Sequence, residues 1–384
     1  MIPYGKQEIT QDDIDAVVEV LKSPLITQGP KAVEFESGIA NYTGAEFSVS
    51  FNSATSALHC AALALGLRKG EWLWSSPISF VASANCGIYC DAKVDFVDIN
   101  PKTYNLDPQA LEKKLKNTKK HKLPKVLVVV HFAGQSADME KIYKLSLKYN
   151  FKIIEDASHA LGGSYKGSKI GSCKFSDITI FSFHPVKIIT CGEGGVATTN
   201  SKKYAAKMQM LKSHGITKEN LENKPHGSWY YEQQIIGFNY RLSELHAALG
   251  LSQLKRLDAY IKRRNEIAEI YNNAFKDLEL TTPYVESHNL SAFHLYVICL
   301  TKKSGIKRKA LFEELLKCGI APQVHYIPIH LQPFYARFGF KKGDFKKAES
   351  YYKSAITLPL YPTLSETEIN KVIEAIKANV AKKA

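Results

Sequence analysis

The sequence lacks the long hydrophobic runs and the leader-like start that mark membrane and secreted proteins. No apolar stretch approaches the roughly 18–20 residues that cross a bilayer, and the longest runs, such as 126–130, have the length of a strand. Residues 1–6 contain no basic start followed by an apolar segment, so no signal peptide is expected. These absences predict a soluble, cytoplasmic protein with no membrane partner.

Cysteine motifs are also absent. The seven cysteines are dispersed and no two of them form a Cys-x-x-Cys pair, so the sequence predicts neither a zinc site nor a disulfide framework. Most of them lie among apolar neighbours, which is typical of buried free thiols. We therefore expect a protein without a bound metal.

Acidic residues are in the minority, with 37 Asp and Glu against 51 Lys and Arg, and the net charge is +14. Seven of the lysines lie between residues 113 and 125, in a stretch expected to flank a loop. A basic nucleic-acid-binding protein is one interpretation, but no recognition motif or interleaving of aromatic and basic residues accompanies the charge. The other interpretation is a solvated surface whose positive field also attracts an anionic substrate.

What is present is an alternation of strand-like and helix-like segments over about the first 240 residues. Short β-branched or aromatic runs predict strands at 47–51, 72–75, 94–97, 126–130, 152–155, 178–183 and 196–199. Helical patterns lie between several of them, for example at 54–65 and 138–149, and a capping-box pattern starts a helix over 10–21. This alternation is typical of an α/β fold with a mostly parallel central sheet and helices on both faces.

The pattern changes after about residue 240. Leucines at 242, 245 and 249 start a long helical stretch towards Phe275, a smaller α+β region follows, and a last helix starts at Ser365. At about 150 residues per domain, we expect a large domain over 1–250 and a small C-terminal domain over 251–384. We also expect the N-terminal helix to pack with the small domain.

Polar segments follow several of the predicted strands. Ligands of an open α/β sheet bind outside the carboxyl ends of its strands, so these segments are expected to lie close together. Asn52–Leu58 starts a helix whose amides and Thr55 hydroxyl can bind a phosphate, although an ordinary helix cap explains the same pattern. Phe80 follows the next strand, where it either stacks on a flat ring or belongs to the core.

Asp156 and Lys187 are the candidates for catalysis. Asp156 follows the strand at 152–155, with His159 three residues later. Its carboxylate can keep a pyridine nitrogen protonated, or it can cap a helix. Lys187 lies between apolar residues, and burial there would lower its pKa towards that of a nucleophilic amine. Ser182 provides a hydroxyl near the end of the preceding strand.

Together these segments have the order and spacing of a known family. The chain resembles the sugar aminotransferases of the DegT/DnrJ/EryC1/StrS family, which have fold type I and use pyridoxal 5'-phosphate (PLP). The resemblance extends over nearly the whole chain and is carried by residues 52–58, 77–80, 131–135, 155–163, 181–195 and 237–254. Residues 52–58, 183–190, 213–217 and 229–233 resemble the pseudaminic-acid branch of this family.

The resemblance implies roles for single residues. Lys187 matches the lysine that holds PLP as a Schiff base, and Asp156 matches the carboxylate at the pyridine nitrogen. The other cofactor residues that it implies are His159 at the ring hydroxyl, Phe80 on the ring face, Ala54, Thr55 and Ser182 at the phosphate, and Asn239 from the partner subunit. Weaker candidates for contacts with the sugar are Thr27, Gln323, His325 and His330, of which the last three serve equally well as satisfied core residues.

The resemblance also implies a homodimer with shared active sites and L-glutamate as the amino donor. The implied acceptor is a UDP-linked 4-keto-6-deoxy-N-acetylhexosamine, aminated at C4. Amination of another nucleotide-linked 4-keto or 3-keto sugar remains an alternative. Sugar dehydratases are the nearest other enzymes of this fold, but they have histidine in place of the lysine, and Lys187 argues against that activity.

Overall fold

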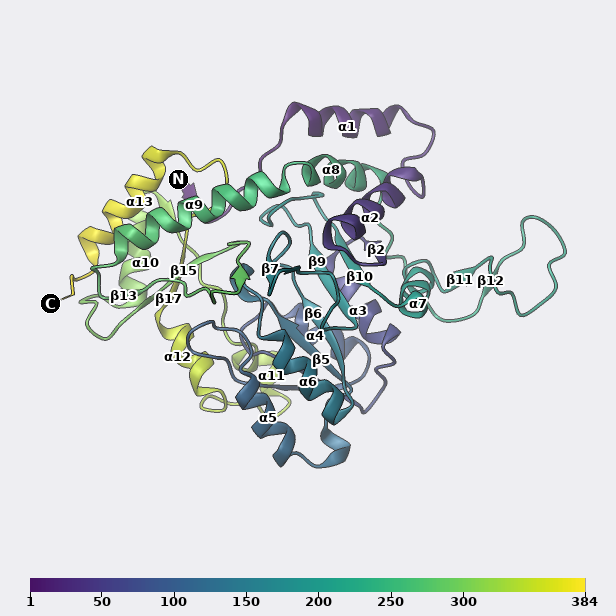
Figure 1. Ribbon diagram of the computed structural model, residues 1–384, viewed down its shortest axis with the longest axis horizontal. Helices are drawn as coiled ribbons and strands as arrows, with labels where there is room; N and C mark the ends of the chain where they lie inside the picture. The colour runs from purple at the N-terminus through teal and green to yellow at the C-terminus, as the bar shows by residue number, and fades with distance from the viewer. Residues whose placement is uncertain (384) are drawn as a thin grey trace.

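A seven-stranded sheet forms the centre of the computed structural model, which describes residues 1–383 (Figure 1). The strand order is β2 (Phe47–Phe51), β10 (Gly195–Thr199), β9 (Ile178–Ser182), β6 (Lys152–Asp156), β5 (Val126–Val130), β3 (Trp72–Ser75) and β4 (Lys93–Phe96). Only β10 runs antiparallel to its neighbours. The α/β prediction is confirmed, and no strand boundary differs from its predicted position by more than one residue.

Both faces of the sheet are buried, as the unbroken apolar run of β5 predicts. Val126 and Val128 pack in one hydrophobic cluster, whereas Leu127 and Val129 pack in another. The first cluster includes residues of α3 (Ala54–Ala64), α4 (Ala82–Tyr89) and α7 (Lys202–Lys212), and the second those of α5 (Pro108–Asn117) and α6 (Met139–Tyr149). A third cluster joins β9 and β10 to α2 (Pro30–Thr43) and α8 (Glu244–Leu254).

The long helix predicted between 242 and 275 is two helices. After α8, the chain breaks at residues 255–256 before α9 (Leu257–Phe275) begins. The break lets an Arg256 Nη2–H donate to the buried Asp13 carboxylate at 2.6 Å. Gln253 Nε2 donates to the same oxygen at 2.7 Å. These two bonds fix α1 (Gln11–Lys22) on the α8–α9 junction.

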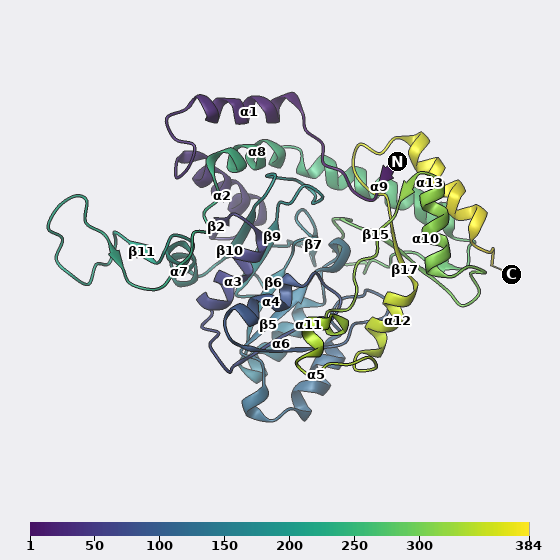
Figure 2. The same ribbon diagram turned by 180° about the vertical axis from the view of Figure 1, so that it is seen from behind.

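A separate hydrophobic core lies in the C-terminal region. There α9, α10 (Arg308–Lys317) and α13 (Glu366–Asn379) pack on the strands β13 (Leu280–Thr281), β15 (Tyr296–Leu300) and β17 (Ala355–Leu358). The strand β1 (Ile2–Pro3) pairs with β16 (Ile320–Ala321) at this core, and Figure 2 shows the N-terminus beside α9 and α13. The chain therefore reaches the C-terminal core through β1, whereas α1 packs on α8 and on the α8–α9 junction.

The remaining elements are short. They are β7 (Ser164–Tyr165), β8 (Ser168–Lys169), β14 (Asn289–Leu290), β11 (Ile216–Thr217), β12 (Glu232–Gln233), α11 (Pro333–Ala336), α12 (Lys346–Ser354) and the 3₁₀ turns η1 (Lys120–Lys122), η2 (Phe132–Gly134) and η3 (Ile329–Leu331). Strands β11 and β12 form the base of an arm that projects from the body in both views (Figures 1 and 2).

The lysine-rich stretch belongs to α5 and η1 rather than to a loop flank alone. Lys114 turns inward, with Nζ 2.6 Å from the Asp95 carboxylate and 4.7 Å from the centroid of the Trp74 ring.

Within residues 1–383, no helix is both long and apolar enough to cross a membrane. The same residues contain no group of His, Cys, Asp and Glu side chains arranged to hold a metal ion, and all seven cysteines are free.

Candidate active site

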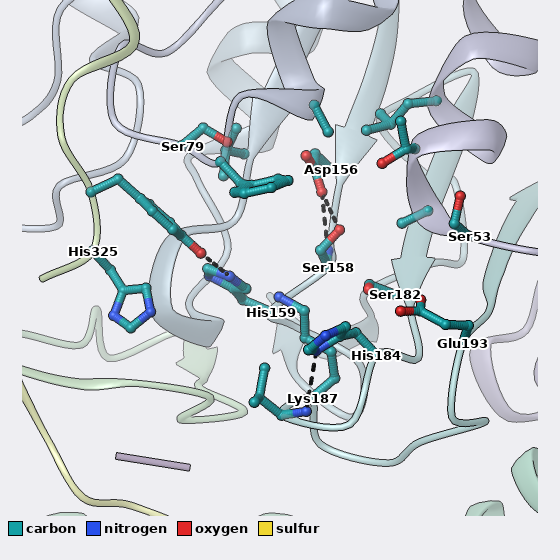
Figure 3. Close-up of a pocket in the computed structure, with 18 of the residues that line it drawn as sticks. Ser53, Ser79, Asp156, Ser158, His159, Ser182, His184, Lys187, Glu193 and His325 are labelled. Atoms are coloured by element: carbon teal, nitrogen blue, oxygen red, sulfur yellow. Dashed lines mark hydrogen bonds between the residues drawn. The ribbon is translucent and has the colours of Figure 1, made fainter. Parts of the chain in front are cut away.

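A cavity of about 310 Å³ lies at the carboxyl ends of β6 and β9, next to the start of α3. Figure 3 shows Asp156, His159, Ser182 and Lys187 around this space. These side chains come from segments that follow neighbouring strands of the central sheet. The cavity therefore lies at the sheet edge where an open α/β fold binds its ligands.

Lys187 lies in the turn between β9 and β10. Its backbone N–H donates to the His184 carbonyl at 2.9 Å, and the next two residues, Ile188 and Ile189, are buried in the core. Burial lowers the pKa of Lys187 to about 8, although the charge of Asp156 acts in the opposite direction. A large fraction of the amine is therefore neutral at mildly alkaline pH, and the neutral amine is the form that attacks a carbonyl group.

Asp156 is buried at the end of β6. Its Oδ1 accepts hydrogen bonds from the Ser158 amide at 3.2 Å and from the Ser158 hydroxyl at 2.6 Å. The Ser83 hydroxyl donates to Oδ2 at 2.5 Å. All three donors are neutral, so none of the hydrogen bonds of this carboxylate comes from a cation. A buried carboxylate in such a setting favours a cationic ligand.

The N-terminus of α3 borders the cavity beside Ser182. Ser53 caps this helix by accepting a hydrogen bond from the Ser56 amide at 3.1 Å. Within residues 1–383, the amides of Ala54 and Thr55 have no protein acceptor, and such amides at a helix start bind phosphate groups. Gly195 on β10 permits this close approach, because a Cβ atom there would lie 2.4 Å from Ala54 N.

His159 is held as a neutral ring. The Ala133 amide donates to Nδ1 at 3.3 Å, so Nε2 carries the hydrogen and donates to the Tyr326 hydroxyl at 3.0 Å. Burial, reinforced by the charge of Lys187, lowers the pKa of His159 well below its usual value. Ala133 has a φ of 58°, a left-handed conformation that aims its amide at the ring.

A buried cluster around Glu155 supports the strand that carries Asp156. The Glu155 carboxylate accepts hydrogen bonds from His131 Nε2 at 2.5 Å, from the Ser176 hydroxyl at 2.5 Å and from the Thr179 hydroxyl at 3.0 Å. Burial acts to raise the pKa of Glu155, but these donors outweigh it, and the pKa is lowered. The cluster thereby ties β6 to β9 and to the loop after β5.

Two of the other predicted residues line the cavity. Phe80 has 59% of its surface exposed there, which excludes the interpretation of Phe80 as a core residue. His325 is buried in the cavity wall, where its Nδ1 lies 2.8 Å from the Thr357 hydroxyl. Burial and the charge of Lys187 lower the pKa of His325 to about 3, so this ring is neutral at physiological pH.

Four predicted residues do not line the cavity of this chain. His330 has no exposed surface and its Nε2 lies 3.1 Å from Glu349, so the structure favours the core alternative for this residue. Gln323 is exposed outside the cavity, where its backbone pairs with that of Thr357. Thr27 and Asn239 are also exposed, in backbone bridges to Ser243 and Ser213 respectively.

The sequence interpretation missed several residues that line the cavity, among them Tyr4, His184, Glu193 and Tyr326. His184 and Glu193 lie within the motif 181–195, which therefore contained a signal for them. Tyr326 lies between Gln323 and His330, and nothing in the local sequence distinguishes it from these polar residues as a ligand contact. Tyr4 had no local signal, because the pairing of β1 with β16 brings it to the site.

Comparisons with known proteins agree with this geometry. The model of the DegT/DnrJ/EryC1/StrS aminotransferase family matches residues 7–377. A UDP-4-amino-4,6-dideoxy-N-acetyl-beta-L-altrosamine transaminase of Campylobacter jejuni is 39% identical over 366 residues, which are 95% of this chain and 94% of the relative. The solved structure of Helicobacter pylori PseC, an aminotransferase involved in the biosynthesis of pseudoaminic acid, has a TM-score of 0.89 and 33% identity over 98% of both chains. Spr1654 from Streptococcus pneumoniae, described as a sugar aminotransferase and solved in its PLP-form, has a TM-score of 0.89 and 30% identity, also over 98% of both chains. The chain therefore belongs to the DegT/DnrJ/EryC1/StrS aminotransferase family.

Proposed function

We propose that this aminotransferase uses PLP to transfer an amino group from L-glutamate to C4 of a UDP-linked 4-keto-6-deoxy-N-acetylhexosamine, a step of pseudaminic acid biosynthesis. The observation that carries the proposal is the meeting of Lys187 and Asp156 in one cavity at the strand ends. The named relatives in Campylobacter jejuni and Helicobacter pylori support the sugar and the pathway.

The residues of the cavity fit PLP. Lys187 Nζ is the amine that would hold it, and the buried Asp156 carboxylate, which has only neutral donors, suits a protonated ring nitrogen. The unpaired amides of Ala54 and Thr55 suit the phosphate, and Phe80 offers an exposed aromatic face. When bound, PLP supplies an aldehyde that exchanges amines and a ring that withdraws electrons from the neighbouring carbon.

The protein's own groups then hold and move protons. Lys187 Nζ, whose pKa burial lowers to about 8, takes up and returns the proton that each half of the reaction moves. The Asp156 carboxylate keeps a positive charge at the ring nitrogen favourable. His159 cannot compete for protons near neutral pH, because burial keeps its ring uncharged.

We also propose that two copies of the chain share their active sites. The arm between β11 and β12 projects from the body (Figures 1 and 2), and 69% of Trp229 and 56% of Tyr231 are exposed on it. Apolar side chains exposed on a projecting arm favour coverage by another protein surface. Asn239 is exposed, as a residue that completes a partner's cavity must be before assembly.

The division into a cofactor-binding domain over 1–250 and a small domain over 251–384 remains our proposal for the chain's organisation. The separate hydrophobic core of the C-terminal region supports it. A cytoplasmic location also remains a proposal, supported by seven cysteines that are all free thiols.

The test is a reconstituted reaction. The protein is incubated with PLP, L-glutamate and a purified UDP-linked 4-keto-6-deoxy-N-acetylhexosamine, and the product is identified by mass spectrometry and NMR. We expect an amine at C4 and the formation of 2-oxoglutarate, and neither with Lys187→Ala. Turnover only with a 3-keto sugar or with another nucleotide sugar would favour the alternative acceptor. Light scattering on the same preparation measures whether the protein is a dimer.

A further inference from the structure

The N-terminal residues form one wall of the cavity, although they lie far in sequence from the motifs of the sheet. Ile2 pairs with Ile320 and Pro3 with Ala321, and the Tyr4 carbonyl accepts a hydrogen bond from the Leu360 amide at 3.0 Å. Residues 2–4, which we call the N-terminal strap, are therefore fixed to the C-terminal region. The strap ends at Tyr4, which lines the same cavity as Lys187.

Tyr4 differs from its neighbours in this wall because its polar group is not engaged by the protein. The Tyr326 hydroxyl bonds with His159, and His325 Nδ1 bonds with Thr357. For the side-chain hydroxyl of Tyr4, no partner exists among residues 1–383. The Tyr4 ring packs edge-on to His325 with 5.0 Å between ring centroids, which holds the ring at the cavity.

The hydroxyl of Tyr4 is a neutral donor. Burial raises the pKa of Tyr4 above its usual value, so the phenol keeps its hydrogen over the whole working range of an enzyme. An unengaged neutral hydroxyl suits a hydroxyl or amide oxygen of a ligand, whereas a carboxylate is bound best by cationic groups. This chemistry fits a sugar better than it fits glutamate.

The size of the cavity also favours a contact between Tyr4 and the acceptor sugar. About 310 Å³ is near the lower limit for sites that enclose a drug-sized ligand. An acceptor that reaches a cofactor at Lys187 therefore lies close to the cavity walls, of which Tyr4 is a part. Tyrosine combines an apolar face with a polar tip, and a pyranose ring likewise presents C–H faces and hydroxyl edges.

We propose that Tyr4 is a specificity-determining residue, which contacts the acceptor sugar through its ring and donates its hydroxyl hydrogen to a sugar oxygen. The inference rests on the proposed function, because it names a contact of the same acceptor. The residues at the strand ends then act in both half-reactions, whereas Tyr4 of the strap contacts only the sugar. Tyr4 thus acts in the half-reaction with the sugar and not in the half-reaction with glutamate.

The two half-reactions can be measured apart. The first is followed in single turnovers with L-glutamate through the absorbance change of the bound cofactor, and the second through sugar amination under steady state with saturating glutamate. Tyr4→Phe removes the hydroxyl and keeps the ring, and Tyr4→Ala removes both. Tyr143→Phe is the matched control, because Tyr143 is likewise half-buried but lies on α6 outside the cavity.

We expect Tyr4→Phe to raise KM for the sugar about tenfold, as the loss of one hydrogen bond does, and Tyr4→Ala to raise it further. The rate of the glutamate half-reaction and the properties of Tyr143→Phe should match the unmodified enzyme. An unchanged KM for the sugar in Tyr4→Phe, or an equal loss in both half-reactions, would overturn the proposal. If Tyr4→Ala fails to fold, as circular dichroism would reveal, Tyr4→Phe alone decides.

Failure of the proposed function gives a different result. In that case the unmodified enzyme reacts with glutamate but aminates no UDP-linked 4-keto sugar. The further inference fails if the unmodified enzyme aminates the sugar and Tyr4→Phe either does so with the same KM or loses equally in both half-reactions.

Discussion

We predict that the charge of Lys187 lowers the free energy of unfolding of the cofactor-free protein. Burial lowers the pKa of Lys187 from 10.5 to about 8, so the protein must hold a charged amine in an unfavourable setting whenever the pH is below that value. We expect Lys187→Met, which has a similar length and no charge, to stabilise the cofactor-free protein at neutral pH. The active-site lysine is thus predicted to lower the free energy of unfolding, which is the reverse of the effect of most core residues.

The magnitude and the sign follow from proton linkage. The difference between 10.5 and about 8 corresponds to about 3 kcal/mol, at about 1.4 kcal/mol per pKa unit. Below pH 8 both folded and unfolded states hold the proton, and the full penalty applies. Between pH 8 and 10.5 only the unfolded state keeps it, so the stability of the unmodified protein rises with pH and the advantage of Lys187→Met shrinks. Above pH 10.5 the advantage from charge is gone.

Urea unfolding of the cofactor-free proteins at pH 7 and at pH 10 tests this prediction. The charge-dependent advantage of Lys187→Met should fall from about 3 kcal/mol to below about 1 kcal/mol between these values. Any gain from better packing of methionine would not change with pH, so the difference between the two conditions isolates the charge. Lys262→Met, at an exposed position of α9, is the control. An advantage that is absent, or equal at both pH values, would refute the reasoning.

Three further predictions concern the charged groups of the site and its support. Lys187→Arg should fold normally but form no aminated sugar, which product analysis and circular dichroism would check; normal activity would remove Lys187 from its role. Asp156→Ala should still bind PLP, measured by absorbance, and transfer amino groups about a hundredfold to ten-thousandfold more slowly; a near-native rate would contradict the role of Asp156. Glu155→Ala leaves the buried His131 Nε2–H without its acceptor and should lower the free energy of unfolding by about 3 kcal/mol. Urea unfolding measures that loss, and Glu155→Gln should recover part of it.

The sheet and the residues at its strand ends could be predicted because local sequence determines both. The apolar run of β5 is buried on both faces, and a run with that composition has few other stable arrangements. Asp156 and Lys187 each follow such a strand, so the rule for ligand sites in open sheets places them at one edge of the sheet. The roles of these residues remain proposals, but their proximity is a property of the fold.

Tyr4, Tyr326 and His330 show where local sequence was insufficient. Tyr4 reaches the cavity through the pairing of β1 with β16, two segments more than 300 residues apart. The polar residues of the segment 323–330 suggest contacts with a ligand, but their pattern cannot tell which side chains face the cavity: Tyr326 lines it, whereas His330 bonds with Glu349 in the core. The break between α8 and α9 likewise has no signal in the local pattern, and Arg256 at the break bonds with the distant Asp13.

The energetics of Lys187 and Asp156 connect stability to cofactor binding. Asp156 raises the pKa of Lys187, but burial has the larger effect, so the two charges do not fully compensate each other within the protein. Asp156 is buried and Lys187 is half-buried, and the donors around Asp156 are neutral. A cofactor that takes up the amine and gives the carboxylate a cationic partner relieves both penalties at once, and it binds only the folded state. Such binding stabilises by about 2.7 kcal/mol at a hundredfold excess over Kd, which is close to the penalty inferred for the lysine alone. Lys187 and Asp156 are therefore poorly compensated only in the cofactor-free protein, because the cofactor provides the missing partners when it binds.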